Sequence, residues 1–203
     1  MLLFKAATDG LQAATNLLGR INAAVLALGR GLGVLCVAAM VVIILVQVWW
    51  RYVLGNALPW SEEAARFLML WMTGLMAPTA FRRGGFVAID MVLGYLPPRL
   101  GALINLASLS VAFVVIWVGF HLGWAETMGI GGRFSMSALQ VPLSWDFSVW
   151  MKVPRAWMMA SLAVGVTLML SVVIELIART VLQLLGQGQG LIVIAQPEGF
   201  GAE

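Results

Sequence analysis

The sequence GLGVLCVAAMVVIILVQVWW, at residues 31–50, decides the fold. It contains no charged side chain, and Arg51 follows it directly. A bilayer core is about 30 Å thick and a helix rises about 1.5 Å per residue, so about 20 apolar residues cross it. This stretch therefore predicts a transmembrane helix.

Three further apolar stretches of similar length follow at residues 61–81, 101–124 and 156–175. In the whole chain 62% of the residues are hydrophobic and only 10% are charged, whereas soluble domains carry about 25% charged residues. Backbone groups in lipid must form their hydrogen bonds within the segment, which favours helices. We therefore predict an all-α integral membrane protein with four transmembrane helices, in a domain over residues 31–179.

Residues 1–30 show the pattern of an amphipathic helix. Apolar side chains recur at steps of three and four on one face, and polar side chains occupy another: Leu11, Ala14, Leu18, Ile21, Val25 and Leu28 against Gln12, Asn16 and Arg20. Such a helix either lies in the membrane interface or packs against a partner helix. The weak charge of its polar face favours the interface.

The connections between the predicted spans are identified by proline, glycine and helix-capping residues. An amphipathic segment at residues 89–96 is ended by two prolines, because proline cannot continue a helix. The connection at residues 126–155 opens with glycine-rich loop sequence, after which Ser144 is placed to cap a short helix reaching Trp150. Alternating glycine and glutamine favour a flexible tail at residues 180–203.

Basic residues indicate the orientation, because an even number of spans places both termini on one side. That side holds the larger set, Lys5, Arg20, Arg30, Arg82, Arg83, Arg99 and Arg179, against Arg51, Arg66, Arg133, Lys152 and Arg155 on the other. Positive charge favours the cytoplasm, so both termini are predicted to be cytoplasmic. Most of the nine tryptophans, which favour the headgroup layer, gather on the opposite side: Trp49, Trp50, Trp60, Trp124, Trp145, Trp150 and Trp157.

The sequence offers little catalytic chemistry. His121 is the one histidine and Cys36 the one cysteine, so neither a paired-histidine haem site nor a zinc cluster can form within the chain. It contains no GxSxG nucleophile motif and no GxxxxGK[ST] phosphate loop. We expect no enzyme activity, no cofactor and no metal, and we interpret His121 as a packed or interfacial side chain.

Charged side chains inside a membrane are costly and usually mark function. The centres of the four predicted spans contain none, because Glu62, Glu63, Glu126 and Glu175 all fall at span ends. This distribution favours a scaffold over a protein that conducts ions by itself.

Charged residues gather where the first span ends and the second begins. We define the outer cluster as Arg51, Trp60, Glu62, Glu63 and Arg66. Glutamates complement a helix N-terminus, and Arg51 can reach them to form an ion pair. The cluster is interpreted as a latch that holds this helical hairpin; the alternative is a docking surface for another protein outside the membrane.

Small residues four apart let helices approach closely. Gly119 and Gly123 have this spacing in the third span, and Ala156 with Ala160 and Ser161 with Gly165 repeat it in the fourth. We interpret them as packing positions within the bundle, in preference to a dedicated partner face.

The order of several short motifs resembles a known family. They comprise Arg51, Tyr52, Pro59, Trp60, Ser61, Glu62, Glu63, Arg66, Trp71, Gly74, Ala80, Arg82, Gly84, Ile89, Asp90, Leu96 and Pro97, and further on Leu139, Pro142, Trp145 and Pro154. Over residues 31–179 the chain resembles the small membrane (Q-type) subunit of tripartite ATP-independent periplasmic (TRAP) transporters. One departure is Phe86, which stands where that family often has histidine.

The resemblance implies a scaffold subunit in a bacterial inner membrane. It implies a large membrane subunit that carries substrate and ions, and a periplasmic binding protein that delivers the substrate, typically an organic acid. Carried over by residue, it also implies an inner cluster, Arg82, Arg83 and Asp90. From its side of the membrane, we expect the outer cluster to orient the hairpin and to touch the binding protein.

Two other classes remain open. A membrane-anchor subunit of a redox complex typically needs paired axial ligands, and this chain offers only His121. A small homodimeric exporter usually places a carboxylate inside a span. An intramembrane protease ranks last for want of a nucleophile motif.

Overall fold

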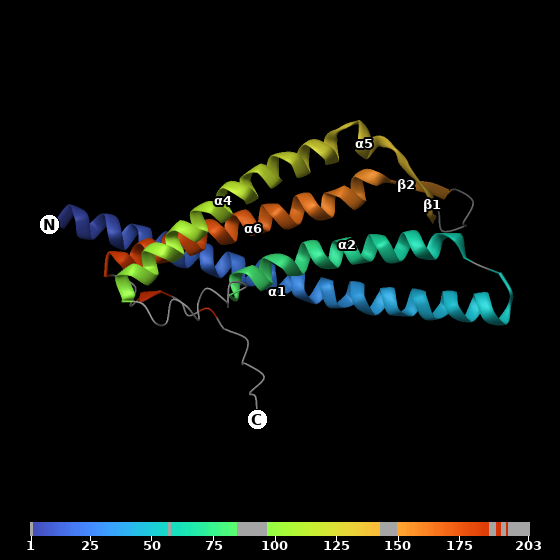
Figure 1. The fold of residues 1–203 in the computed structure, drawn as a ribbon, viewed down its shortest axis with the longest axis horizontal. Coiled ribbons are helices and arrows are strands. Elements are labelled where there is room, and N and C mark those ends of the chain that lie inside the picture. Colours follow the sequence, from blue (N-terminus) through green and yellow to red (C-terminus); the bar gives the residue numbers. More distant parts are fainter. Residues whose placement is uncertain are drawn as a thin grey trace, which may run out of the picture. The chain divides into compact units, whose positions relative to one another are not determined.

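The computed structural model describes residues 2–56, 58–84, 97–142, 150–186, 190–191 and 194. The elements are α1 (Leu2–Val53), α2 (Pro59–Arg82), α4 (Pro98–Met128), α5 (Ile130–Arg133), β1 (Ser135–Pro142), β2 (Trp150–Pro154) and α6 (Arg155–Leu184) (Figure 1). Proline begins both α2 and α4, where its missing N–H costs nothing. Gly84 and Gly186 follow the ends of α2 and α6 with φ of +96° and +75°, which glycine tolerates best.

Helices cover all four stretches that the sequence predicted to span the membrane. Three helices are both long and apolar enough to cross a bilayer, at Thr8–Val53, Leu100–Met128 and Arg155–Leu184. The 24-residue α2 is long enough but carries Glu62, Glu63 and Arg66 near its start. The structure is thus that of a helical, multi-pass membrane protein.

The first helix departs from the prediction of a separate segment at residues 1–30. In the structure α1 is one helix of 52 residues without a break (Figure 1, blue to cyan). Thr15 and Asn22 are buried, whereas Leu17 and Leu28 are 61% and 68% exposed. Lipid accepts apolar side chains, while polar groups need partners inside the protein. The face that packs inward therefore contains the polar side chains of Thr15 and Asn22, whereas Arg20 of the predicted polar face is exposed.

The chain divides into two compact units. Unit 1 comprises residues 1–27, 77–118 and 167–203, and unit 2 comprises residues 28–76 and 119–166. The long helices contribute a segment to each unit, so each unit is an assembly of helix segments distant in sequence.

Small residues bring helices together within unit 2. A Cβ added at Gly165 of α6 would lie 2.7 Å from the carbonyl oxygen of Gly74 in α2. A Cβ at Gly74 would collide with the carbonyl oxygen of Ser161. On α4, a Cβ at Gly123 would lie 3.3 Å from the Cα of Ala163 in α6. The predicted packing residues thus lie at contacts between helices of the same chain.

Gly119 and Ala160 complete the predicted packing set and are less tightly placed. A Cβ at Gly119 would lie 3.6 Å from the Cγ1 of Val166, which is ordinary contact. Ala160 is half-buried.

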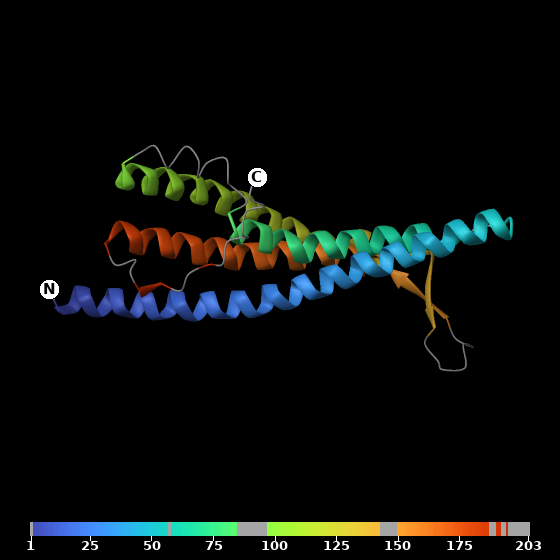
Figure 2. The same ribbon diagram turned by 90° about the horizontal axis from the view of Figure 1, so that it is seen from below.

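The connection before α6 contains a β-hairpin, where the sequence predicted a short helix reaching Trp150. β1 pairs with β2 in antiparallel fashion, and Trp150 belongs to β2, which leads directly into α6 (Figure 2). Trp150 is therefore part of a strand, and the other residues of the predicted helix lie outside the described part of the chain. Regular pairing breaks between Ser135 and Gln140, where β1 carries a bulge or irregularity.

Other predictions lie outside the described residues. These are the amphipathic segment at 89–96, Phe86, Asp90, residues 144–149 and most of the tail. The start of that tail is helical to Leu184, and Asn16 Nδ2 donates a hydrogen bond to the carbonyl oxygen of Gly190 at 3.0 Å.

Candidate functional site

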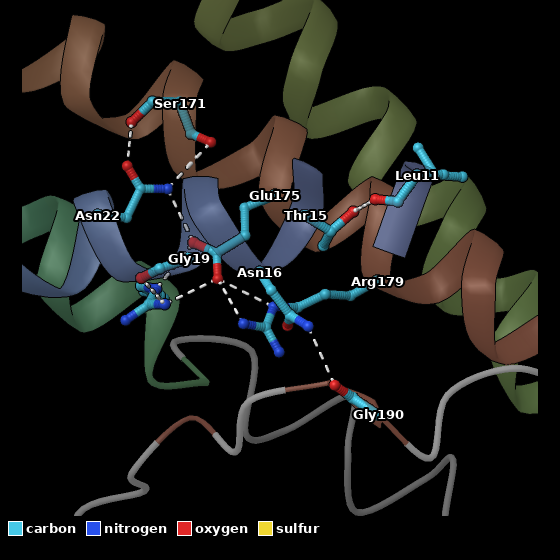
Figure 3. Close-up of polar contacts among 10 residues, drawn as sticks. Leu11, Thr15, Asn16, Gly19, Asn22, Ser171, Glu175, Arg179 and Gly190 are labelled. Carbon is cyan, nitrogen blue, oxygen red and sulfur yellow. Dashed lines mark hydrogen bonds and ion pairs between the residues drawn. The ribbon is translucent and has the colours of Figure 1, made fainter. Parts of the chain in front are cut away.

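A buried ion cluster forms around Glu175 in unit 1. The side chain of Glu175, on α6, has no exposed surface. Arg82, in the last turn of α2, donates from Nη2 to Oε1 at 2.7 Å and from Nε to Oε2 at 3.0 Å. Arg179, one turn further along α6, donates from Nε to Oε1 at 2.9 Å. One carboxylate thus binds two guanidinium groups (Figure 3).

Helix α1 completes this cluster with polar groups. Asn22 Nδ2 donates to Glu175 Oε2 at 2.8 Å, and Asn22 Oδ1 accepts from the hydroxyl of Ser171 at 3.0 Å (Figure 3). The carbonyl oxygen of Gly19 accepts from Arg82 Nη2 at 2.9 Å. We call Asn22, Arg82, Glu175 and Arg179 the Glu175 cluster. It joins segments of α1, α2 and α6.

The contacts of the Glu175 cluster are those of a structural ion cluster, which holds helix segments together. A carboxylate offers about four lone-pair sites, and four donors from three side chains occupy them here. Breaking a buried ion pair by removing one partner costs about 3–5 kcal/mol, because the remaining charge is left uncompensated. Among the described residues no group of His, Cys, Asp and Glu is placed to hold a metal ion.

Sequence reasoning missed this cluster because it placed Glu175 at the end of the fourth span. In the structure α6 continues to Leu184, and Glu175 is fully buried. Arg179 stands four residues after Glu175, the spacing at which helical side chains meet. This spacing and the apolar residues after Glu175 are the sequence features from which the contact between Glu175 and Arg179 could have been predicted.

Of the predicted inner cluster, Arg82 belongs to the Glu175 cluster and Arg83 does not. Arg83 is half-buried, and among the described residues it forms no ion pair. Asp90 is not described.

Gly19 is placed directly against the ion cluster. A Cβ at this position would lie 2.8 Å from Arg179 Nη2 and 2.9 Å from Glu175 Oε1, closer than Cβ contacts normally allow. We predict that Gly19→Ala destabilises the protein by about 1–3 kcal/mol, because the ion pairs must shift to make room. Gly10→Ala is the control, since nothing lies within 4 Å of its Cβ. Unfolding in mixed micelles measures both, and equal stability of the two variants would contradict the assigned packing.

In unit 2, Glu63 of the outer cluster binds the β-hairpin. Its Oε2 accepts from the backbone N–H groups of Ala138 and Leu139 at 2.9 and 2.8 Å, and its Oε1 accepts from the Ser137 hydroxyl at 2.9 Å. These donors lie in the part of β1 where regular pairing with β2 is interrupted. The carboxylate thus takes the place of a neighbouring strand and attaches α2 to β1.

The expected ion pair between Arg51 and the two glutamates is absent. Glu62 pairs with Arg66 one turn away at 3.0 Å, with both side chains largely exposed, and such pairs contribute little stability. Glu63 is occupied by β1. Arg51 is exposed and forms no ion pair within the described part of the chain. The hairpin of α1 and α2 is therefore not held by Arg51.

Trp60, the remaining member of the outer cluster, lines a recess of about 590 Å³ with Trp150 and residues 138–140 of β1. His121 lies on the exposed side of α4 with its ring edge against Phe120, at a centroid distance of 5.7 Å. This position agrees with a packed or interfacial side chain.

We predict that Glu63→Gln loosens β1 locally. The amide group of glutamine replaces one acceptor oxygen with a donor, so at least one N–H of β1 loses a bond to a charged partner. Such bonds contribute about 1.5–3 kcal/mol. Hydrogen exchange at the Ala138 and Leu139 amides is expected to accelerate about tenfold or more. Glu62→Gln should leave these amides unchanged; the same rate in both variants would argue against the latch.

The long apolar helices and the buried ion pairs around Glu175 define a class: a helical, multi-pass membrane protein. Comparison with known proteins defines the family. Residues 40–183 match the family described as tripartite ATP-independent periplasmic transporters, DctQ component. This match covers more than half of the chain, which therefore belongs to that family. It is a component of a TRAP transporter in the inner membrane and not an enzyme.

Two curated relatives agree with this family. The isethionate TRAP transporter permease protein DctMQ of Oleidesulfovibrio alaskensis is 28% identical over 94 residues, which cover 41% of this chain but 15% of that protein. A protein of Haemophilus influenzae, named as a TRAP transporter small permease protein, is 25% identical over 115 residues, covering 52% of this chain and 71% of that protein. The chain thus spans only a small part of the first relative.

Proposed function

We propose that this chain is the small scaffold subunit of an ion-driven, ATP-independent uptake transporter for organic acids. It pairs with a large membrane subunit, and a periplasmic binding protein supplies the substrate. The observation that carries the proposal is the state of Glu175: the one fully buried carboxylate among the described helices is saturated by Arg82, Arg179 and Asn22. A carboxylate held in this way stabilises a bundle and leaves no free ligand for a transported ion.

The relatives support the pairing with a large subunit. The O. alaskensis protein carries the matched region as 15% of a longer permease whose name combines two components. The substrate of the transporter belongs to the organic acids in the broad sense, a class that includes the isethionate named for that relative.

Co-purification tests this proposal. The chain is extracted from its native membrane in a mild detergent, and the proteins that elute with it are identified by mass. A much larger polytopic membrane protein in constant ratio to the chain is the expected result. A homodimer without a partner would favour an exporter, and a haem-containing partner would favour a redox anchor; either result would overturn the assignment.

The topology belongs to the same proposal: four spans, with α2 as the second, and both termini in the cytoplasm. Because Cys36 is the one cysteine, Cys36→Ser gives a clean background for labelling. A membrane-impermeant maleimide on intact spheroplasts is expected to label Arg133→Cys, in α5. Gly10→Cys, in α1, should react only after permeabilisation. The reverse pattern would invert the topology, and labelling of both positions from outside would exclude an even number of spans.

We further propose that the outer cluster meets the periplasmic binding protein. Glu62, Arg66 and Arg51 are exposed and do not hold the hairpin, so their charges are available to a partner. Reversing the charge of Glu62 should lower uptake at limiting binding protein, with assembly of the membrane subunits unchanged. Uptake that is unchanged by this reversal would remove the outer cluster from the proposed contact.

A further inference from the structure

A small recess lies where the start of α2, β1 and the start of α6 meet, all within unit 2 (Figure 1). Its volume is about 160 Å³, and it is lined by Glu63, Arg66, Met136, Arg155 and Met158. Pockets that hold whole small molecules usually measure about 300–1,000 Å³. This recess therefore has room for a single chemical group of a larger partner.

The walls of this recess are fixed by contacts that do not use its arginines. Glu63 on α2 accepts the backbone N–H groups of β1. Trp71 Nε1 donates to the carbonyl oxygen of Trp157 at 3.1 Å, which joins α2 to α6, and the close approach of Gly74 to α6 follows along the same helix pair. A recess that is already formed costs little to order when a partner group enters it.

Both arginines of the recess retain N–H donors that no described residue uses. The side chain of Arg155 is exposed and forms no hydrogen bond or ion pair with the described residues. Arg66 donates from Nη2 to Glu62, and a guanidinium has five donors. Neither arginine forms an ion pair with Glu63, whose oxygens accept from β1. Arg155 also begins α6, where the helix dipole favours an anion.

We propose that this recess receives the carboxylate of an acidic side chain on the periplasmic binding protein, an inference that rests on the proposed function. A carboxylate matches a guanidinium group in both charge and geometry. Met136 and Met158 supply an apolar wall for the aliphatic part of such a side chain. Arg66 also belongs to the outer cluster, so the recess continues the surface that we propose meets the binding protein.

The test measures uptake by the complete transporter, reconstituted in liposomes, while the concentration of the binding protein is varied. Arg155→Gln is expected to raise the concentration that gives half-maximal uptake at least about tenfold, because a charge-assisted contact is lost. The maximal rate and assembly with the large subunit should stay unchanged. Arg133→Gln is the matched control, since it removes the same charge from an exposed side chain that does not line the recess. It should behave like the natural chain.

A second measurement uses the natural chain, in case Arg155→Gln does not fold. Phenylglyoxal, which reacts selectively with arginine, is added to the reconstituted complex, and the modified residues are identified by mass spectrometry. The binding protein should slow the modification of Arg155 and leave that of Arg133 unchanged.

Three outcomes would overturn the inference. Equal half-maximal concentrations for Arg155→Gln and Arg133→Gln would remove the recess from the contact, while the chain would remain a transporter subunit. Protection of Arg155 by phosphatidylglycerol vesicles without the binding protein would assign the recess to a lipid. Uptake that needs no binding protein would instead refute the proposed function, and this inference with it.

Discussion

Glu175→Leu is expected to lower the free energy of unfolding by about 3–5 kcal/mol, because it leaves Arg82 and Arg179 buried without their carboxylate. Both guanidinium groups have side chains at most 11% exposed, so water cannot replace the lost partner. A loss of this size is a large part of the stability of a typical protein. The chain should therefore be scarce in membranes, and the purified variant should unfold at lower denaturant.

The matched control is Glu126→Gln, which removes a glutamate at an exposed position of α4. It should change stability by no more than about 0.5 kcal/mol. If Glu175→Leu and Glu126→Gln accumulated equally and unfolded together, the Glu175 cluster would not be the lock that its contacts indicate.

Gly74→Ala is expected to have the second large effect. The added Cβ would collide with the backbone carbonyl of Ser161, and a Cβ at Gly165 would in turn approach Gly74. Backbone atoms on both sides cannot move aside as a side chain can, so α2 and α6 must separate. Overpacking of this kind costs about 1–3 kcal/mol, and it should lower the unfolding midpoint of the purified chain.

Gly31→Ala provides the control, because nothing lies within 4 Å of its Cβ in α1. Alanine stabilises a helix interior by about 1 kcal/mol relative to glycine, so this variant should be as stable as the natural chain or more so. If Gly74→Ala raised the stability as much as Gly31→Ala does, α2 and α6 would not be in close contact at Gly74.

The sequence predicted the helices because hydropathy over about 20 residues measures directly whether a segment prefers lipid. Residues 31–50 and 156–175 lie inside α1 and α6 for that reason. It could not predict that the face with Thr15 and Asn22 packs inward. That outcome depends on Ser171 and Glu175, which lie about 150 positions away from Asn22, and periodicity alone contains no such information.

The same lack of information about distant contacts explains why the sequence did not predict the partners of Glu175 and Glu63. Glu175 was predicted to be a charge at the end of a span, because a charge normally closes an apolar run, and its burial against Arg82 is known only from the structure. Glu63 was recognised as a member of the outer cluster, but its partners are backbone N–H groups of β1. Backbone donors have no signature in the amino-acid sequence. The short separation in sequence instead suggested Arg51 as the partner of Glu63, but Arg51 forms no ion pair with the described residues.

The central claim is that the charges of this subunit hold its bundle and do not carry ions. It is tested most directly by replacing the three ionised groups of the Glu175 cluster together, with Arg82→Met, Glu175→Leu and Arg179→Leu. Buried ion clusters can often be exchanged for apolar residues without loss of stability. The complex assembled with this triple variant is reconstituted, and substrate uptake and the number of coupled ions per substrate are measured. The account predicts uptake per assembled complex and an ion ratio equal to those of the natural complex. An assembled complex with lost uptake or a changed ion ratio would show that the cluster takes part in transport.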